Sequence, residues 1–232
     1  MYFKNLGLQA QCGGVLNPVD IGDVYYDYDD FQKTPVTAED YTLTQATTGA
    51  MALSAGAENG VLELDCASST NTQGANLQRM AASFTPKAGR NIWFEAKVKI
   101  ADTGTALETS GEIFVGLSEM DTTIIDSGAV SPSNFIGFSS VTDNGVLLAN
   151  SEKANTGTTS SACTIADDTY VTLGFKVNGL DTIVFYVNGS VVAVHETANI
   201  PIVALAPSFV MHSSGTTDPI MYIDYWACMQ TR

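Results

Sequence analysis

Residues 169–196 read TYVTLGFKVNGLDTIVFYVNGSVVAVHE. Over residues 171–177 apolar side chains alternate with mostly polar ones, and the same period of two returns over residues 183–187. An Asn-Gly dipeptide ends each run, and Asn-Gly tolerates positive φ at both central positions of a two-residue hairpin turn. The pattern therefore predicts three antiparallel strands that follow one another as a meander.

The clearest strand upstream of this meander is predicted at residues 92–100, IWFEAKVKI. One side of it carries only apolar residues, namely Ile92, Phe94, Ala96, Val98 and Ile100. The other side carries Trp93, Glu95, Lys97 and Lys99. Because successive strand residues point to opposite faces, the first side is expected to pack on a core and the second to meet water or a partner.

Short strands separated by turn residues account for most of the chain. They are predicted at residues 61–66, 77–84, 112–118, 135–141, 146–149, 203–211 and 220–229. Residues 41–57 permit one more short strand, and residues 150–161 are predicted to be a long, flexible loop. No long window shows a helical period, so the sequence predicts an all-β protein, a two-sheet antiparallel jelly-roll sandwich.

Residues 1–33 differ from the rest, and an extended N-terminal arm is predicted there, followed by one jelly-roll domain over residues 34–232. Gly13-Gly14 and Asn17-Pro18 interrupt any regular element. Residues 24–31, VYYDYDDF, mix rings and carboxylates without a clear strand alternation. One interpretation lays this segment along its own domain, with the rings buried and the carboxylates in water. The other makes it a contact arm for a capsid or a neighbouring subunit, because tyrosine supplies a large contact area at low entropic cost. The arm's contact residues are then Tyr2, Phe3, Tyr25, Tyr26, Tyr28 and Phe31.

Composition limits the class of protein. Of the 232 residues, 45% are hydrophobic and 15% are charged, which suits a packed β protein and not a disordered chain. The formal net charge is −15, from 10 basic and 25 acidic residues, so we expect no nucleic-acid partner. No apolar run approaches the ~18 residues of a membrane helix, so we expect no membrane partner either.

The N-terminus lacks the long apolar core of a secretory signal, which favours synthesis in a reducing cytoplasm. Cys12, Cys66, Cys163 and Cys228 are scattered, without the close pairs that mark zinc or redox sites. We therefore expect four reduced thiols.

The order of several segments resembles a known family. These are the IWFEAKVKI strand, the EIFVGL strand, GFKVNG with IVFYVNGSVVAV, and the final YIDYWA. Together, over residues 61–229, they resemble the concanavalin A-like lectin/glucanase jelly roll. Members of this family include sugar-binding modules, endo-glucanases and structural proteins of tailed bacteriophages. The resemblance implies the fold and does not by itself imply an activity.

The glucanases of this family resemble one another in a Glu-x-Asp-x-x-Glu or Glu-x-Asp-x-Glu strand that supplies a nucleophile and an acid. The nearest match in this chain is residues 119–124, with Glu119 and Asp121 present. Thr123 and Ile124 occupy the positions of the acid, and neither side chain protonates a leaving glycoside. We therefore predict no catalytic residues and no enzymatic activity.

Metal and cofactor sites are not expected. Asp143-Asn144, Asp167-Asp168 and the group Asp27, Asp29 and Asp30 resemble pieces of the family's calcium site, but each has too few oxygen ligands. His195 and His212 each fall on a predicted strand, where a hydrogen-bonded structural role is expected.

Sugar binding is an alternative function. Trp93 and Tyr186 lie on the polar side of the predicted sheet and are the candidate residues for stacking on a glycan. Trp226 either joins them or fills the core.

The leading hypothesis is a virion structural protein, a decoration or cement protein on the capsid surface of a tailed phage, assembled in the host cytoplasm. Its expected partners are the major capsid protein and further copies of itself, with a trimer among the arrangements. An acidic protein suits the outer surface, because packaged DNA would repel it. The alternative is a carbohydrate-binding module, tail-associated or on a cell surface.

Overall fold

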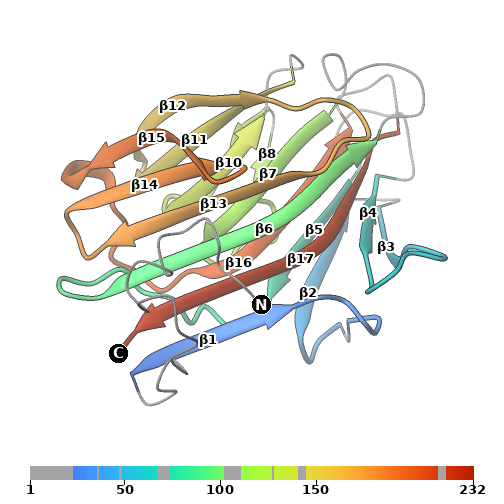
Figure 1. Ribbon diagram of the computed structural model, residues 1–232, viewed down its shortest axis with the longest axis horizontal. Helices are drawn as coiled ribbons and strands as arrows, with labels where there is room; N and C mark the ends of the chain where they lie inside the picture. Colours follow the sequence, from blue (N-terminus) through green and yellow to red (C-terminus); the bar gives the residue numbers. More distant parts are fainter. Residues whose placement is uncertain are drawn as a thin grey trace.

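Strand β6, Asn91–Ala101, lies near the middle of a large antiparallel sheet, here called sheet A. The computed structural model describes residues 23–35, 37–46, 49–66, 74–101, 111–126, 128–140, 145–213 and 218–232. The strands of sheet A follow the order β15 (Ser190–Glu196), β14 (Thr182–Val187), β13 (Val171–Asn178), β6, β17 (Ile220–Thr231), β4 (Leu62–Asp65) and β3 (Ala50–Leu53). Strand β1, Val24–Asp29, pairs with the second half of β17 (Figure 1).

Sheet B forms the second layer. Its order is β12 (Thr156–Thr164), β11 (Val146–Lys153), β10 (Phe135–Ser140), β7 (Gly111–Ser118), β16 (Ala206–Ser213), β5 (Gly74–Arg79) and β2 (Tyr41–Ala46). A short hairpin of β8 (Ile125–Asp126) and β9 (Ala129–Val130) joins β7 to β10, and a 3-10 turn, η2 (Thr197–Asn199), follows β15. The predicted two-sheet antiparallel jelly roll is confirmed.

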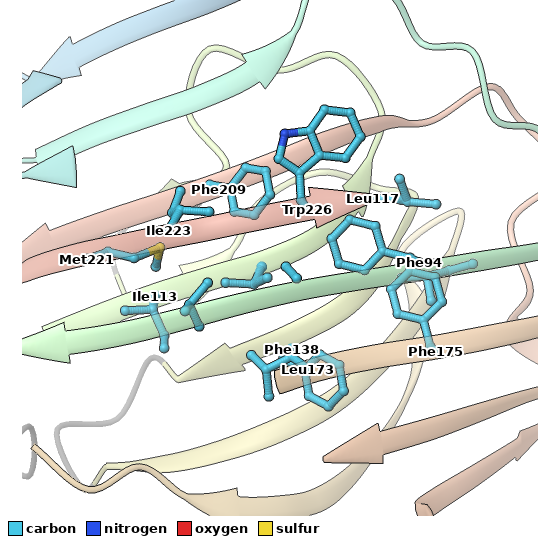
Figure 2. Packing of buried hydrophobic residues seen from close by; sticks show 14 of the residues in the cluster. Phe94, Ile113, Leu117, Phe138, Leu173, Phe175, Phe209, Met221, Ile223 and Trp226 are labelled. Carbon is cyan, nitrogen blue, oxygen red and sulfur yellow. The ribbon is translucent and has the colours of Figure 1, made fainter. Parts of the chain in front are cut away.

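The core lies between the inner faces of the two sheets. Figure 2 shows Phe94 and Phe175 of sheet A packed beside Leu117 and Phe138 of sheet B. The Phe94 and Phe175 rings stack with centroids 5.0 Å apart. All five residues predicted to face inward from β6 are buried in this core, namely Ile92, Phe94, Ala96, Val98 and Ile100. Alternation with a period of two thus correctly identified the buried side of the strand.

The predicted meander is also confirmed. Strands β13, β14 and β15 pair in sequence as antiparallel neighbours. Asn188 and Gly189 adopt φ of 48° and 80°, as a two-residue turn with two left-handed centres requires. The side-chain Oδ1 of Asn188 accepts a hydrogen bond from the backbone N–H of Thr172 at 2.9 Å, which links the turn back to β13.

The predicted loop over residues 150–161 is wrong. Strand β11 continues to Lys153, the chain turns at Ala154 and Asn155, and β12 begins at Thr156. Ala154 and Asn155 have φ of 50° and 63°, so an ordinary alanine occupies a position that favours glycine. The two turn residues include no glycine, so the sequence pattern does not predict the turn between β11 and β12. The small residues of β12 are also typical of a loop.

The predicted arm over residues 1–33 requires correction at its C-terminal end. Residues Val24–Asp29 form strand β1 of sheet A, and Phe31 is fully buried in the core. Tyr25 also faces inward, with its ring 5.0 Å from that of Phe84. Tyr2 and Phe3 lie outside the described residues. The described chain therefore enters the fold at β1, ahead of the predicted domain boundary at residue 34.

Inward-facing acids explain why the sequence of β1 was misread. Asp27 Oδ1 and Oδ2 accept hydrogen bonds from Arg79 Nη2 and Nε, each at 2.9 Å. Asp29 Oδ2 accepts one from the hydroxyl of Tyr41 at 2.9 Å. Carboxylates with such partners can occupy the inward positions of an edge strand. The strand therefore does alternate. Its inward positions include Asp27 and Asp29, where apolar residues usually mark the buried side of a strand.

In the described part of the chain, no helix is both long enough and apolar enough to span a membrane.

Candidate binding surface

The outer face of sheet A carries two continuous rows of side chains that cross six strands. Cross-strand pairing defines the first row as Val194, Val184, Lys176, Trp93, Met229 and Tyr26. It defines the second as Val191, Tyr186, Gly174, Glu95, Ala227 and Tyr28. We call these two rows, together with the flanking Tyr170, Tyr222 and Tyr225, the tyrosine face. In Figure 1 its strands β15, β14, β13, β6, β17 and β1 lie side by side.

The ends of the two rows are open to solvent. Tyr26 and Tyr28 are 41% and 43% exposed, and their rings stack with centroids 5.7 Å apart. Val191 and Val194, at the other end, are 58% and 53% exposed. The exposed residues therefore form two small separate groups, one on β1 and one on β15.

Trp93, a candidate residue for stacking on a glycan, lies on the predicted side of the sheet but is buried there. It is only 2% exposed and packs with Met229, Val24 and Tyr186. The Nζ of Lys176 lies 5.5 Å from the centre of its ring. Its indole N–H is buried and has no hydrogen-bond partner in the part of the chain that the structure describes. Trp226, by contrast, fills the core and donates its indole N–H to the hydroxyl of Tyr41 at 2.8 Å.

Charged pairs flank the rows near β17. Lys97 Nζ lies 2.6 Å from a carboxylate oxygen of Asp224, and Lys99 Nζ lies 2.6 Å from one of Asp168. Each lysine also lies over a tyrosine ring, with Lys99 Nζ 4.4 Å from the centre of Tyr222. The hydrogen bond with Asp168 raises the pKa of Lys99, so this side chain stays charged. These exposed pairs fix side-chain positions more than they stabilise the fold.

Glu95 is a buried acid near the middle of the second row. It is 3% exposed and accepts a hydrogen bond from the hydroxyl of Tyr225 at 2.8 Å. Burial raises the pKa of the Glu95 carboxyl, because loss of water disfavours the charged form. Desolvation likewise raises the pKa of Tyr225, so its hydroxyl stays protonated and donates.

Part of the outer face of sheet B, over β5, β7, β10 and β16, is covered by its own chain. The segment after β7, with β8 and β9, packs Ile124 and Ile125 on Phe114, Phe135 and Val210. Gln78 fastens the start of this segment, because its Oε1 accepts the N–H of Asp121 at 3.0 Å and its Nε2 donates to the carbonyl of Glu119 at 3.2 Å.

Glu119 and Asp121, the residues that resemble a glucanase motif, both have structural partners in this segment. The Oε1 of Glu119 accepts the backbone N–H groups of Ser133 and Asn134, and its Oε2 accepts the side-chain amide of Asn134 at 3.0 Å. Asp121 Oδ1 accepts the N–H of Thr123 at 2.8 Å. Both carboxylates therefore hold the loop after β7 in place through hydrogen bonds.

The two histidines considered from the sequence are buried inside the fold. The ring nitrogens of His195 lie 2.9 Å from Ser151 Oγ and 3.1 Å from Ser160 Oγ, and burial lowers the pKa of His195. His212 is also buried. Asp143-Asn144 lies outside the described residues, and no group of three or more potential metal ligands is present among the described ones.

Sequence reasoning assigned Tyr26 and Tyr28 to an arm and overlooked Tyr170, Tyr222 and Tyr225. The pairing register of β17 with β6 shifts between Ile223 and Tyr225. At this bulge Asp224 and Tyr225 both point away from the core, so a strict period of two does not hold through YIDYWA. Of the tyrosines on this face, only Tyr186 was assigned to the correct side of the sheet.

No protein-family model matches this sequence, and no curated protein sequence matches it. Several solved structures share its fold. An endo-1,3-beta-glucanase from Streptomyces sioyaensis aligns with a TM-score of 0.64 at 13% identity, over 90% of this chain and 96% of that one. Peanut lectin aligns with a TM-score of 0.57 at 12% identity, over 90% and 98%. A protein of unknown function from Shewanella oneidensis MR-1 aligns with a TM-score of 0.59 at 15% identity, over 90% and 87%. At such identities the likeness shows the fold alone, which is the concanavalin A-like jelly roll.

Proposed function

We propose that this chain is a non-enzymatic structural protein that docks on a protein partner through the tyrosine face. The observation that carries this proposal is the pair of rows across six strands, which are mostly apolar and aromatic apart from Lys176 and Glu95 and are exposed at their ends. Aromatic and methionine side chains are enriched at the centres of protein interfaces, with polar pairs at the rim. On the tyrosine face the exposed rings of Tyr26 and Tyr28 are the aromatic contacts, and the Lys97–Asp224 pair lies beside the rows.

The finer proposal is a decoration or cement protein on the head of a tailed phage, with the major capsid protein as its partner. It rests on the resemblance of the sequence to a family whose members include phage structural proteins, and on the net charge of −15, which disfavours contact with packaged DNA. Several copies that dock together gain avidity without new contacts, so self-association, as in a trimer, suits this role.

The test measures co-sedimentation of the full chain with expanded capsids. The wild-type protein is expected to sediment with them, and the double variant Tyr26→Ser, Tyr28→Ser is expected to lose most of that binding. Ser161→Ala, on an exposed position of β12, is the matched control and is expected to bind as wild type. Undiminished binding of the double variant assigns docking to another surface, and no binding by the wild type contradicts the decoration role.

Glycan binding is the second candidate function. It is favoured by the adjacent, exposed rings of Tyr26 and Tyr28 and by a fold shared with a lectin. The buried Trp93 does not offer a free ring face, so Tyr26 and Tyr28 are the stacking residues of this candidate. A glycan panel tests it: retention of a glycan by the wild type, and its loss in the double variant, favours this function over protein docking.

The non-enzymatic part of the proposal is supported by the partners of Glu119 and Asp121. Retaining glycoside hydrolysis needs two carboxyl groups ~5.5 Å apart that are free to attack and to protonate. Incubation with mixed β-glucans, agars and carrageenans is expected to release no reducing ends. Release that disappears in Glu119→Gln contradicts the proposal and restores the glucanase assignment.

A further inference from the structure

Asn-Gly pairs are chemically labile positions, and this chain has four of them. Three lie wholly within the described residues, namely Asn59-Gly60, Asn178-Gly179 and Asn188-Gly189. Glycine has no Cβ, so little hinders an attack by its backbone nitrogen on the side-chain amide of the preceding asparagine. The dipeptide is the same in all three pairs, and their tertiary contacts therefore distinguish them.

The reaction is deamidation, and water is its only co-reactant. The backbone nitrogen of the glycine gives up its proton to hydroxide and attacks Cγ of the asparagine. The new N–C bond closes a succinimide ring, and the side-chain nitrogen leaves as ammonia with a proton taken from water. Water then opens the ring at one of its two carbonyl carbons, which gives aspartate or isoaspartate. The attack requires a side chain that is free to turn and a glycine N–H that is free of other bonds.

Both groups of the Asn178-Gly179 pair are held by hydrogen bonds. Nδ2 of Asn178 donates to Oγ1 of Thr182 at 2.8 Å. The N–H of Gly179 donates to the backbone carbonyl of Arg90 at 3.1 Å. These bonds must break before the nitrogen can reach the side chain, so the native fold is expected to slow the deamidation of Asn178.

The side chain of Asn188 is held as well. Its Oδ1 accepts the N–H of Thr172 at 2.9 Å, and its own backbone N–H donates to the carbonyl of Thr172 at 2.8 Å. The side chain is thus fixed on β13 and is not free to turn toward Gly189. Deamidation of Asn188 is therefore also expected to be slow in the native protein.

The pair Asn59-Gly60, in the turn between β3 and β4, lacks these restraints. Asn59 is exposed. Within the described part of the chain, neither its side chain nor the N–H of Gly60 has a hydrogen-bond partner. The two residues have φ of 68° and 76°, which an Asn-Gly turn adopts readily. Of the three described pairs, this one has the most freedom to react.

The position of Gly60 gives this reaction a consequence for the fold. A Cβ atom built on Gly60 would lie 2.2 Å from the carbonyl oxygen of Phe31 and 2.7 Å from that of Asp30. The turn thus packs closely on the chain that follows β1, where Phe31 is buried in the core. Isoaspartate adds one carbon to the backbone next to Gly60, and such close packing leaves no room for the shift that this carbon causes.

We propose that Asn59 is a site of spontaneous deamidation, that it reacts before Asn178 and Asn188 in the folded protein, and that isoaspartate at this position loosens the chain after β1. This inference concerns the ageing of the chain and stands independently of the proposed docking function.

Peptide mapping of the aged full chain tests the order of reaction. The protein is held in mildly alkaline buffer, digested, and followed by mass spectrometry for the mass gain of an amide that becomes an acid. Trypsin releases residues 34–79, with Asn59, apart from residues 177–232, with Asn178 and Asn188. Fragment ions are expected to show Asn59 reacting several-fold faster than the other two in the native protein, and at a similar rate to them in urea. An unaged sample digested in parallel is the control. Equal native rates, or a faster reaction at either of the other two, overturn the proposal.

Thr182→Val tests why Asn178 is slow. It removes the hydroxyl that holds the Asn178 side chain and keeps the shape of the residue. The variant is expected to speed the deamidation of Asn178 and to leave that of Asn59 unchanged. An unchanged rate at Asn178 overturns the assignment of the order to side-chain restraint.

Urea denaturation of fresh and aged protein tests the effect on the fold. The midpoint of the wild type is expected to fall in step with isoaspartate at position 59, which labelling by an isoaspartyl methyltransferase measures. Asn59→Gln, whose longer side chain closes the ring far more slowly, is expected to keep its midpoint on ageing, and circular dichroism checks that it folds. A constant midpoint in the aged wild type, or an equal fall in the variant, overturns the loosening of the chain after β1.

Discussion

Arg79 and Asp27 lie 52 positions apart in the sequence and form a two-point ion pair, with both N–O distances at 2.9 Å. The pair joins β5 of sheet B to β1 of sheet A. Arg79 also lies over the rings of Tyr41 and Trp226, at 5.0 and 5.8 Å from their centres. The Arg79 side chain thus joins β1, the first described strand of sheet A, to sheet B.

Asp27→Asn is expected to destabilise the fold. The substitution keeps the shape but removes the charge that faces Arg79, and both side chains are mostly shielded from water, with 18% and 24% exposed. Loss of a charge-assisted, two-point bond in such a place costs about 2 kcal/mol of unfolding free energy. Urea denaturation measures it. Glu58→Gln, on an exposed turn, is the control and is expected to cost almost nothing. An equal effect of both variants contradicts a special role for the Arg79 pair.

Ala154→Gly is expected to stabilise the protein. Ala154 has φ of 50°, where a Cβ atom is strained and glycine is not. The gain is about 1 kcal/mol, partly offset by the greater freedom of glycine in the unfolded chain. Ala166→Gly is the control, since Ala166 is exposed and has no positive φ, and there the substitution is expected to destabilise. Thermal unfolding of the two variants should move in opposite directions, and a loss of stability in both rejects the β11–β12 turn.

Glu95→Gln is expected to stabilise the protein at neutral pH. Burial raises the pKa of Glu95, so the folded protein keeps this proton to a higher pH than the unfolded chain does. Stability contributed by the protonated acid is therefore lost as pH rises through the raised pKa. Glutamine carries no such loss and still accepts the hydroxyl of Tyr225. The advantage of the variant is expected to vanish below about pH 4, where the acid is protonated in both states. Denaturation across pH measures it, and an advantage that does not vary with pH contradicts the assignment.

Four thiols are expected to react in the denatured protein, and fewer to react quickly in the native one. Burial raises the pKa of the Cys228 and Cys163 thiols, which lowers the reactive thiolate fraction. The thiol of Cys66 donates to the carbonyl of Met211 at 3.5 Å. Titration with a chromogenic disulfide reagent, before and after denaturation, measures both numbers. Fewer than four reactive thiols in the denatured protein shows that cysteines pair.

Local patterns in the sequence were enough for the centre of sheet A. The alternation over residues 92–100 and 171–177 correctly predicted both strands and which of their faces points into the core. Asn188-Gly189 correctly predicted a turn with two positive φ values. These features depend only on the period of a strand and on the steric freedom of neighbouring residues, so they can be read within ten positions of the chain.

Contacts between distant parts of the chain decided the rest. The sequence of β1 becomes a strand because Asp27 and Asp29 find Arg79 and Tyr41, which lie on other strands. Trp93 is buried because Met229, Val24 and Tyr186 surround it from three other strands. The bulge at Asp224 brings Tyr225 to the outer face, where Glu95 accepts its hydroxyl. No local period contains these partners, since the free energy of burying a charge or a ring depends on which groups the tertiary fold places around it.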